Sequence, residues 1–149
     1  MTSHANWKKL TENKIDVVRK MIKANENVIA AEYMGYTLEC ALKAACCKTL
    51  HISCYPPTKP TNNSELGHFR THEFDSLLIF SGLSDILGSK SMSWSTFTSY
   101  YTGDWPQIIR YNTESAEKTF TSETVGQLYD LLYDREDSIL KIIFGNKRW

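Results

Sequence analysis

The segment from about residue 27 to residue 50 is apolar almost all the way around when it is drawn as a helix. One face carries apolar or small side chains, namely Val28, Ile29, Ala31, Gly35, Leu38, Leu42 and Ala45. Most of the remaining surface is apolar as well, through Tyr33, Met34, Cys40, Ala41 and Ala44. A helix of this kind needs neighbours on every side, and its small residues allow other helices to approach closely. The sequence therefore predicts an all-α domain with this helix at its centre.

Helical spacing also appears on both sides of this central segment. A first amphipathic helix is predicted over residues 7–24, and the polar break at residues 25–27 is short enough to join antiparallel neighbours. A loop is predicted over residues 54–67, because three of its residues are prolines. A third helix is predicted to begin near Thr71, with that residue as its N-cap.

The C-terminal half continues the helical pattern. Trp94, Phe97 and Tyr101 have helical spacing, and a last long helix is predicted from Ser122 to just before Gly145. The sequence shows no convincing alternation typical of a strand. Residues 1–149 are therefore predicted to form one domain, an up-and-down bundle of four or five helices with its core over about residues 7–145.

Charge and composition narrow the classes of function. Lysine plus arginine and aspartate plus glutamate both number 17, so the formal net charge is zero. A strong nucleic-acid binder needs a positive field, and the totals do not supply one. No apolar run approaches the ~18 residues that span a bilayer, and no apolar leader follows Met1, so we expect a cytoplasmic protein without a membrane partner. The cysteines lack C-x-x-C spacing, which favours free thiols, and no metal or cofactor is predicted.

One polar stripe crosses the central apolar helix. Glu32, Tyr36, Glu39 and Lys43 follow one another at intervals of four, three and four residues, so they lie on one helix face. The stripe has two interpretations. It is either a partly solvated seam that orients the helix, or the wall of a polar cleft that binds a cation or a polar ligand or performs acid–base chemistry.

Three residues elsewhere are candidates to face this stripe. His72 stands at the predicted start of the third helix, where it either bonds a neighbouring group or has a ligand-binding or catalytic role. Arg110 precedes Tyr111 after an aromatic segment, and it is expected either to pair with Glu32 or Glu39 or to hold an anion through its guanidinium fork. We therefore predict that the stripe meets His72 and Arg110 in the folded protein.

Three stretches of the chain resemble the HEPN domain family in their order and spacing. They are ECALKA at residues 39–44, THEFDSLL at residues 71–78, and Arg110-Tyr111 shortly after Trp105. The family shows an E-x-x-L-K-A helix, an H-D-L-x-x-L-L helix start and a later R-Y pair. The resemblance covers about residues 7–145, and it implies an up-and-down helical bundle that is commonly a homodimer. It also implies a setting among prokaryotic toxin–antitoxin, phage-defence and nucleotidyltransferase systems.

Many HEPN domains are metal-independent ribonucleases whose motif is an arginine followed, after four to six residues, by a histidine. No histidine follows His72 in this chain, so Arg110 has no such partner. The resemblance therefore implies a ligand-binding role for Glu39, Lys43, His72, Arg110 and Tyr111, without assigning any catalytic residue.

The predicted function is accordingly a non-catalytic HEPN-like module that binds a nucleotide, RNA or a protein partner such as a nucleotidyltransferase or an effector. The zero net charge favours a small ligand or a protein over extended RNA. Two alternatives stay open. One is a divergent ribonuclease toxin with a rearranged site such as Arg70, His72 and Arg110. The other is a small interaction protein such as an antitoxin or an inhibitor.

Overall fold

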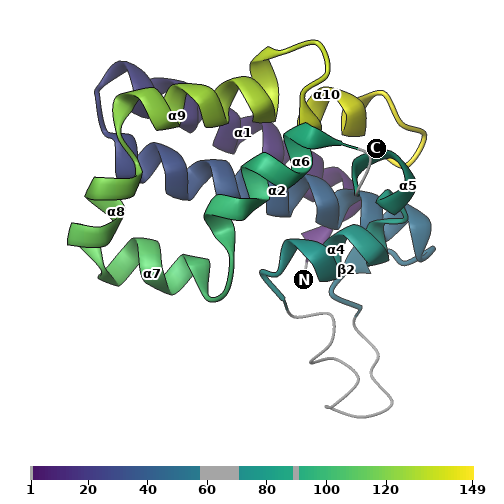
Figure 1. Cartoon of the computed structure of the whole chain (residues 1–149). Coiled ribbons are helices and arrows are strands. Elements are labelled where there is room, and N and C mark those ends of the chain that lie inside the picture. Colours follow the sequence, from purple (N-terminus) through teal and green to yellow (C-terminus); the bar gives the residue numbers. More distant parts are fainter. Residues whose placement is uncertain (1, 58–70, 89–90) are drawn as a thin grey trace.

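The computed structural model describes residues 2–57, 71–88 and 91–149, and most of them are helical (Figure 1). The elements are β1 (Thr2–Ser3), α1 (His4–Lys23), α2 (Asn27–Thr49), β2 (Cys54–Tyr55), α4 (Phe74–Ser81), α5 (Ser84–Leu87), α6 (Met92–Thr98), the 3₁₀ turn η1 (Ser99–Tyr101), α7 (Trp105–Tyr111), α8 (Thr113–Thr119), α9 (Ser122–Tyr129), the π-helical turn η2 (Asp130–Asp134) and α10 (Ile139–Phe144). The predicted all-α class is confirmed.

Helix α1 begins and ends where its residues supply caps. The Ser3 hydroxyl accepts a hydrogen bond from the backbone N–H of Asn6 at 3.2 Å, which satisfies one of the free donors of the first turn. Lys20 and Lys23 lie in the last turn, where positive charge is favourable. Asn25 then adopts a φ of 57°, and the chain reverses into α2, which packs along α1.

Helix α2 runs through the middle of the molecule, with α9 along one side and α4 and α7 along the other (Figure 1). It begins at Asn27 and ends at Thr49, one residue before the predicted end. Nearly every residue from Ala30 to Cys47 is buried, as its all-round apolar pattern predicted. Gly35 permits the closest approach, because a Cβ atom there would lie 2.6 Å from the Trp105 ring.

An aromatic cluster joins the later helices to α2. Its rings come from α4, α6, η1, α7 and the end of α8, namely Phe74, Trp94, Phe97, Tyr101, Trp105 and Phe120. The Tyr101 hydroxyl donates to the Ala31 carbonyl at 2.6 Å, and the Trp105 indole donates to the His72 carbonyl at 3.1 Å. The first bond fixes η1 against the central helix, and the second joins the start of α7 to the segment before α4.

The N-terminal side differs from the prediction at two places. The third helix begins at Phe74 instead of near Thr71, because the Thr71 hydroxyl accepts from the Glu73 N–H and forms a turn before the helix. A short antiparallel pair joins Thr2–Ser3 to Cys54–Tyr55, so the expectation of no strand was wrong. The predicted loop over residues 54–67 thus starts with a strand, and its part from residue 58 lies outside the described residues.

The predicted last long helix is divided. α9 passes into η2, and the chain then leaves helical geometry at Arg135, whose side chain pairs with Asp137 at 3.0 Å. Ser138 restarts the helix as N-cap of α10, because its hydroxyl accepts from the Lys141 N–H. The domain therefore contains more and shorter helices than the four or five expected.

Two further expectations concern the thiols and the membrane. Cys40, Cys46, Cys47 and Cys54 are free cysteines, as predicted. Among the described helices, none is both long and apolar enough to cross a bilayer.

Candidate functional site

The polar stripe of α2 is held together by two hydrogen bonds between residues one helical turn apart. The Tyr36 hydroxyl donates to Glu32 Oε1 at 3.0 Å, and Lys43 Nζ donates to Glu39 Oε1 at 2.5 Å. We call Glu32, Tyr36, Glu39 and Lys43 the polar seam. Its C-terminal half is the more deeply buried, since Glu39 and Lys43 expose only 8% and 10% of their side chains.

Glu39 is the most constrained ionisable group of the seam. Lys43 binds one carboxylate oxygen, and His72 Nδ1 lies 2.8 Å from the other. Burial alone would raise the pKa of Glu39, but the hydrogen bonds and the charges of His72 and Lys43 together outweigh burial and lower the pKa. The carboxylate is therefore ionised, and His72 Nδ1 must be the donor of their hydrogen bond.

His72 lies just before α4 and leaves 58% of its side chain exposed. The hydrogen bond to Glu39 raises the pKa of His72 more than burial lowers it. Because Nδ1 donates to Glu39, the accessible imidazole presents Nε2 as its other polar atom. His72 thus combines a fixed orientation with contact to solvent.

Arg110 reaches the N-terminal half of the seam from the last turn of α7. Its Nε donates to Glu32 Oε1 at 3.2 Å, and its Nη2 donates to the Tyr36 hydroxyl. Its guanidinium carbon also lies 5.4 Å from the centre of the Tyr36 ring. Burial and the hydrogen bond to Glu32 raise the pKa of Tyr36 to about 12, so its hydroxyl keeps its proton. The predicted pairing of Arg110 with Glu32, and the meeting of the seam with His72 and Arg110, are both present.

Tyr111 is the one candidate residue that the structure does not bring into this described group of contacts. Its side chain is on the surface of α7, with 76% of the residue exposed. The neighbouring positions of a helix point about 100° apart, so the face that presents Arg110 to the seam turns Tyr111 outward. Arg70, which belongs to one alternative site, lies outside the described residues.

A cleft of about 330 Å³ opens beside the seam. Its wall includes Tyr36, Glu39 and Arg110, together with residues that the sequence did not connect to the seam, namely Trp7, Leu10, Lys14 and Cys40. The first three of these are spaced three and four residues apart, so they share one face of α1. The sequence shows through this spacing that Trp7, Leu10 and Lys14 share a helix face, but it could not show that this face packs over the seam.

Cations in the seam and its cleft lie against aromatic rings. Lys43 Nζ is 5.1 Å from the centre of the Trp7 ring, and Lys14 Nζ is 5.8 Å from that of Tyr36. Tyr36 therefore has Lys14 near its ring as well as Arg110. The negative face of an aromatic ring attracts such cations.

The charges of the site do not cancel. The carboxylates of Glu32 and Glu39 face the cations Lys14, Lys43 and Arg110, so the formal balance is positive even with His72 neutral. Within the described ranges, no group of three or more histidine, cysteine, aspartate or glutamate residues is arranged to hold a metal. The arrangement is suited to bind an anion next to aromatic surface.

Comparison with known proteins gives no relative: no protein-family model, no curated protein and no solved structure matches the chain.

Proposed function

We propose that this protein is a non-catalytic helical module that binds a mononucleotide in the cleft beside the polar seam. The observation that carries the proposal is the placement of Lys14 and Arg110, from different helices, at the Tyr36 ring and in the wall of one cleft. Both positive charges stabilise an anion that lies between or beside them, and the planar guanidinium of Arg110 is suited to bind a phosphate group.

The rest of the cleft fits the other parts of a nucleotide. The Trp7 ring offers aromatic surface for a base, and Glu39 and Tyr36 offer oxygen acceptors. The volume of about 330 Å³ lies at the small end of the ~300–1,000 Å³ typical of small-molecule sites. A mononucleotide therefore fits this site better than extended RNA, and the zero net charge of the chain favours the same choice.

Isothermal titration with AMP, GMP, CMP and UMP tests the proposal, and adenosine serves as the matched ligand without a phosphate. We expect at least one mononucleotide to bind, and adenosine to bind more weakly than AMP. Arg110→Ala and Lys14→Ala should each weaken binding about tenfold, the scale of one charge-assisted hydrogen bond. Lys118→Ala is the control, because Lys118 is an exposed lysine of α8 that pairs only with Glu114 in the described structure.

The proposal is contradicted if none of the four nucleotides gives heat at millimolar concentration. It is also contradicted if adenosine binds as tightly as AMP, or if Lys118→Ala weakens binding as much as Arg110→Ala.

A second candidate function, a divergent ribonuclease, is favoured by the Glu39–His72 pair. A carboxylate bonded to Nδ1 of an accessible imidazole is an arrangement that general-base catalysis uses. The test is incubation of the purified protein with mixed RNAs, repeated with His72→Ala and Arg110→Ala. Cleavage that is lost in both variants would replace the binding function with this one, and no cleavage by the wild-type chain would exclude it.

The HEPN resemblance adds a biological setting to the proposal. A non-catalytic HEPN-like module would act with a nucleotidyltransferase or an effector of a toxin–antitoxin or phage-defence system, as a homodimer. Co-purification of one stoichiometric protein partner, and a dimeric mass by light scattering, are the results that would support this setting.

A further inference from the structure

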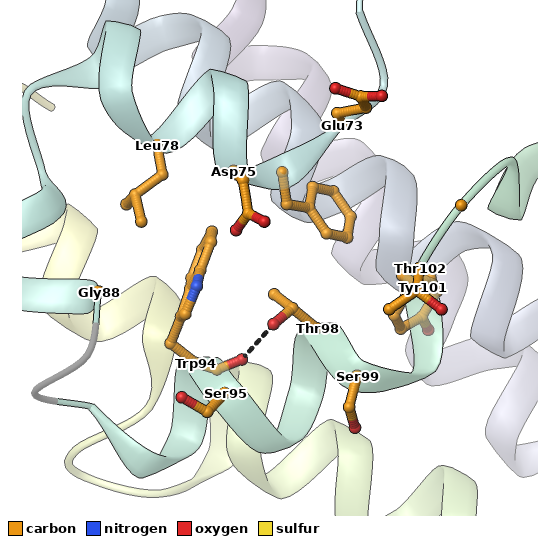
Figure 2. A pocket seen from close by; sticks show the side chains of 12 residues that line it. Glu73, Asp75, Leu78, Gly88, Trp94, Ser95, Thr98, Ser99, Tyr101 and Thr102 are labelled. Atoms are coloured by element: carbon orange, nitrogen blue, oxygen red, sulfur yellow. Dashed lines mark hydrogen bonds between the residues drawn. The ribbon is translucent and has the colours of Figure 1, made fainter.

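A second and larger cleft, of about 640 Å³, lies between α4 and the segment formed by α6 and η1. Figure 2 shows Asp75 pointing from α4 into this space, with Trp94 rising toward it from α6. Glu73 lies at the start of α4, and Thr98 and Ser99 lie on the opposite wall. None of these residues belongs to the polar seam.

The charge of this cleft is opposite to that of the seam. Glu73 and Asp75 both line it and both are exposed, whereas none of its described lining residues is lysine, arginine or histidine. In the described part of the chain, no ion pair reaches either carboxylate. A ligand for this cleft therefore carries positive charge.

The hydroxyl groups of Thr98 and Ser99 on the opposite wall already donate hydrogen bonds to backbone carbonyls. Thr98 Oγ1 donates to the Trp94 carbonyl at 2.8 Å, and Ser99 Oγ donates to the Thr96 carbonyl at 2.6 Å. A hydroxyl has one proton to donate and two lone pairs to accept with, so both groups can only accept from a ligand. The carboxylates also only accept, and a matching ligand must therefore carry several N–H or O–H donors.

The Trp94 indole supplies an independent observation. Trp94 is only 4% exposed, and its N–H makes no hydrogen bond to any other described residue. The Nε1 atom itself keeps accessible surface, and because Trp94 lines the cleft, its N–H is open to the cleft. A ligand oxygen in the cleft can accept a hydrogen bond from it. A ligand that matches the cleft thus carries an acceptor oxygen in addition to its positive charge and its donors.

We propose that this cleft binds a hydroxylated organic amine of the amino-sugar class. Its ammonium groups would lie against Asp75 and Glu73, its hydroxyls would donate to Thr98 and Ser99, and one of its oxygens would accept from the Trp94 indole. A simple polyamine lacks that oxygen. A divalent metal is disfavoured, since the described residues offer no cluster of three or more metal-binding side chains.

The test uses two disaccharides with the same skeleton, at a pH where amines are protonated. One is the β-1,4-linked dimer of glucosamine, and the other is its N-acetylated form, which has no positive charge. The readout is the set of indole ¹H–¹⁵N resonances from the four tryptophans, with Trp94 assigned by Trp94→Phe. We expect the charged dimer to shift the Trp94 resonance in a saturable way, and to bind about tenfold more tightly than the acetylated dimer.

Asp75→Asn is the test variant, and Asp85→Asn is its matched control. Both aspartates are exposed and lie in the first turn of a short helix, but only Asp75 lines the cleft. Asp75→Asn should weaken binding of the charged dimer about tenfold, and Asp85→Asn should leave it unchanged. The proposal is overturned if the charged dimer does not shift Trp94 at millimolar concentration, if both dimers bind equally, or if the two variants bind alike.

Discussion

His72 Nδ1 lies 2.8 Å from Glu39 Oε2, and the two residues are 33 positions apart in the chain. This contact joins the segment before α4 to the buried face of α2. The same carboxylate also binds Lys43, so one buried group neutralises a charge of its own helix and orients a side chain of the segment before α4.

The His72–Glu39 contact makes stability depend on pH. Because the pKa of His72 is raised by Glu39, its contribution is complete below the ordinary histidine pKa of about 6.5 and is lost as the pH rises through the raised value. Because the pKa of Glu39 is lowered, its contribution is present above the ordinary glutamate value and is lost as the pH falls through the lowered one.

We therefore expect the free energy of unfolding of the wild-type chain to fall relative to that of His72→Ala as the pH rises above about 6.5. The pH-dependent difference in free energy of unfolding between the wild-type chain and His72→Ala should stay below about 1 kcal/mol, since His72 is more than half exposed and solvent screens the pair. Urea unfolding at a series of pH values measures it. Parallel pH curves for the two proteins would show that the contact does not form in solution.

Removing the Glu39 carboxylate should be costly. Glu39→Ala leaves Lys43 buried without its partner, and breaking a buried ion pair on one side costs about 3 kcal/mol. Glu114→Ala is the control, because Glu114 and Lys118 have the same spacing on an exposed helix and such pairs are worth about 0.5 kcal/mol. Urea unfolding compares the two variants, and equal losses of stability would contradict the burial of the Glu39–Lys43 pair.

Gly35 should tolerate no side chain. A Cβ atom there would lie 2.6 Å from the Trp105 ring and 2.9 Å from the Tyr101 ring, so Gly35→Ala should destabilise the fold by about 2 kcal/mol. Gly126→Ala is the matched substitution in α9, where nothing lies within 4 Å of the added atom. It should raise stability by about 0.5–1 kcal/mol, because alanine is the better helix former. Thermal unfolding distinguishes the two, and a neutral Gly35→Ala would contradict the close packing of α2 on Trp105.

The thiols should differ in reactivity with a disulfide reagent. Burial raises the pKa of Cys40 to about 12 and that of Cys47 to about 11, and it raises the pKa of Cys46 as well, so few of these thiols ionise. Cys54 is only partly buried. One thiol should therefore react quickly in the folded chain and four after unfolding. Rapid reaction of any thiol in the folded Cys54→Ser variant would contradict the burial of the other three.

The parts of the fold that followed from sequence were those governed by helical periodicity. The all-round apolar pattern of residues 27–50 identified the central helix, and the spacing of Glu32, Tyr36, Glu39 and Lys43 identified its polar face. The break in the C-terminal helix was not predicted, because local bonds of Arg135 and Ser138 decide it and the apolar spacing continues across it.

The candidate site could be predicted only in part for a similar reason. Residues on one helix have a fixed geometry, whereas Lys14 and Trp7 reach the seam through the packing of α1 on α2. The rotation of one helix against another depends on side chains along the whole contact, and a single sequence does not show it. The acidic cleft at Asp75 and Trp94 likewise arises from the packing of distant segments.

The most direct test of nucleotide binding at the seam is an NMR titration of the whole chain with AMP, observed at the tryptophan indole resonances. Trp7 lines the seam cleft, and Trp94 lines the acidic cleft. Binding at the seam predicts a saturable shift of the Trp7 resonance that Arg110→Ala weakens, with Trp94 unmoved. An unchanged Trp7 resonance at saturating AMP, or a shift confined to Trp94, would contradict it.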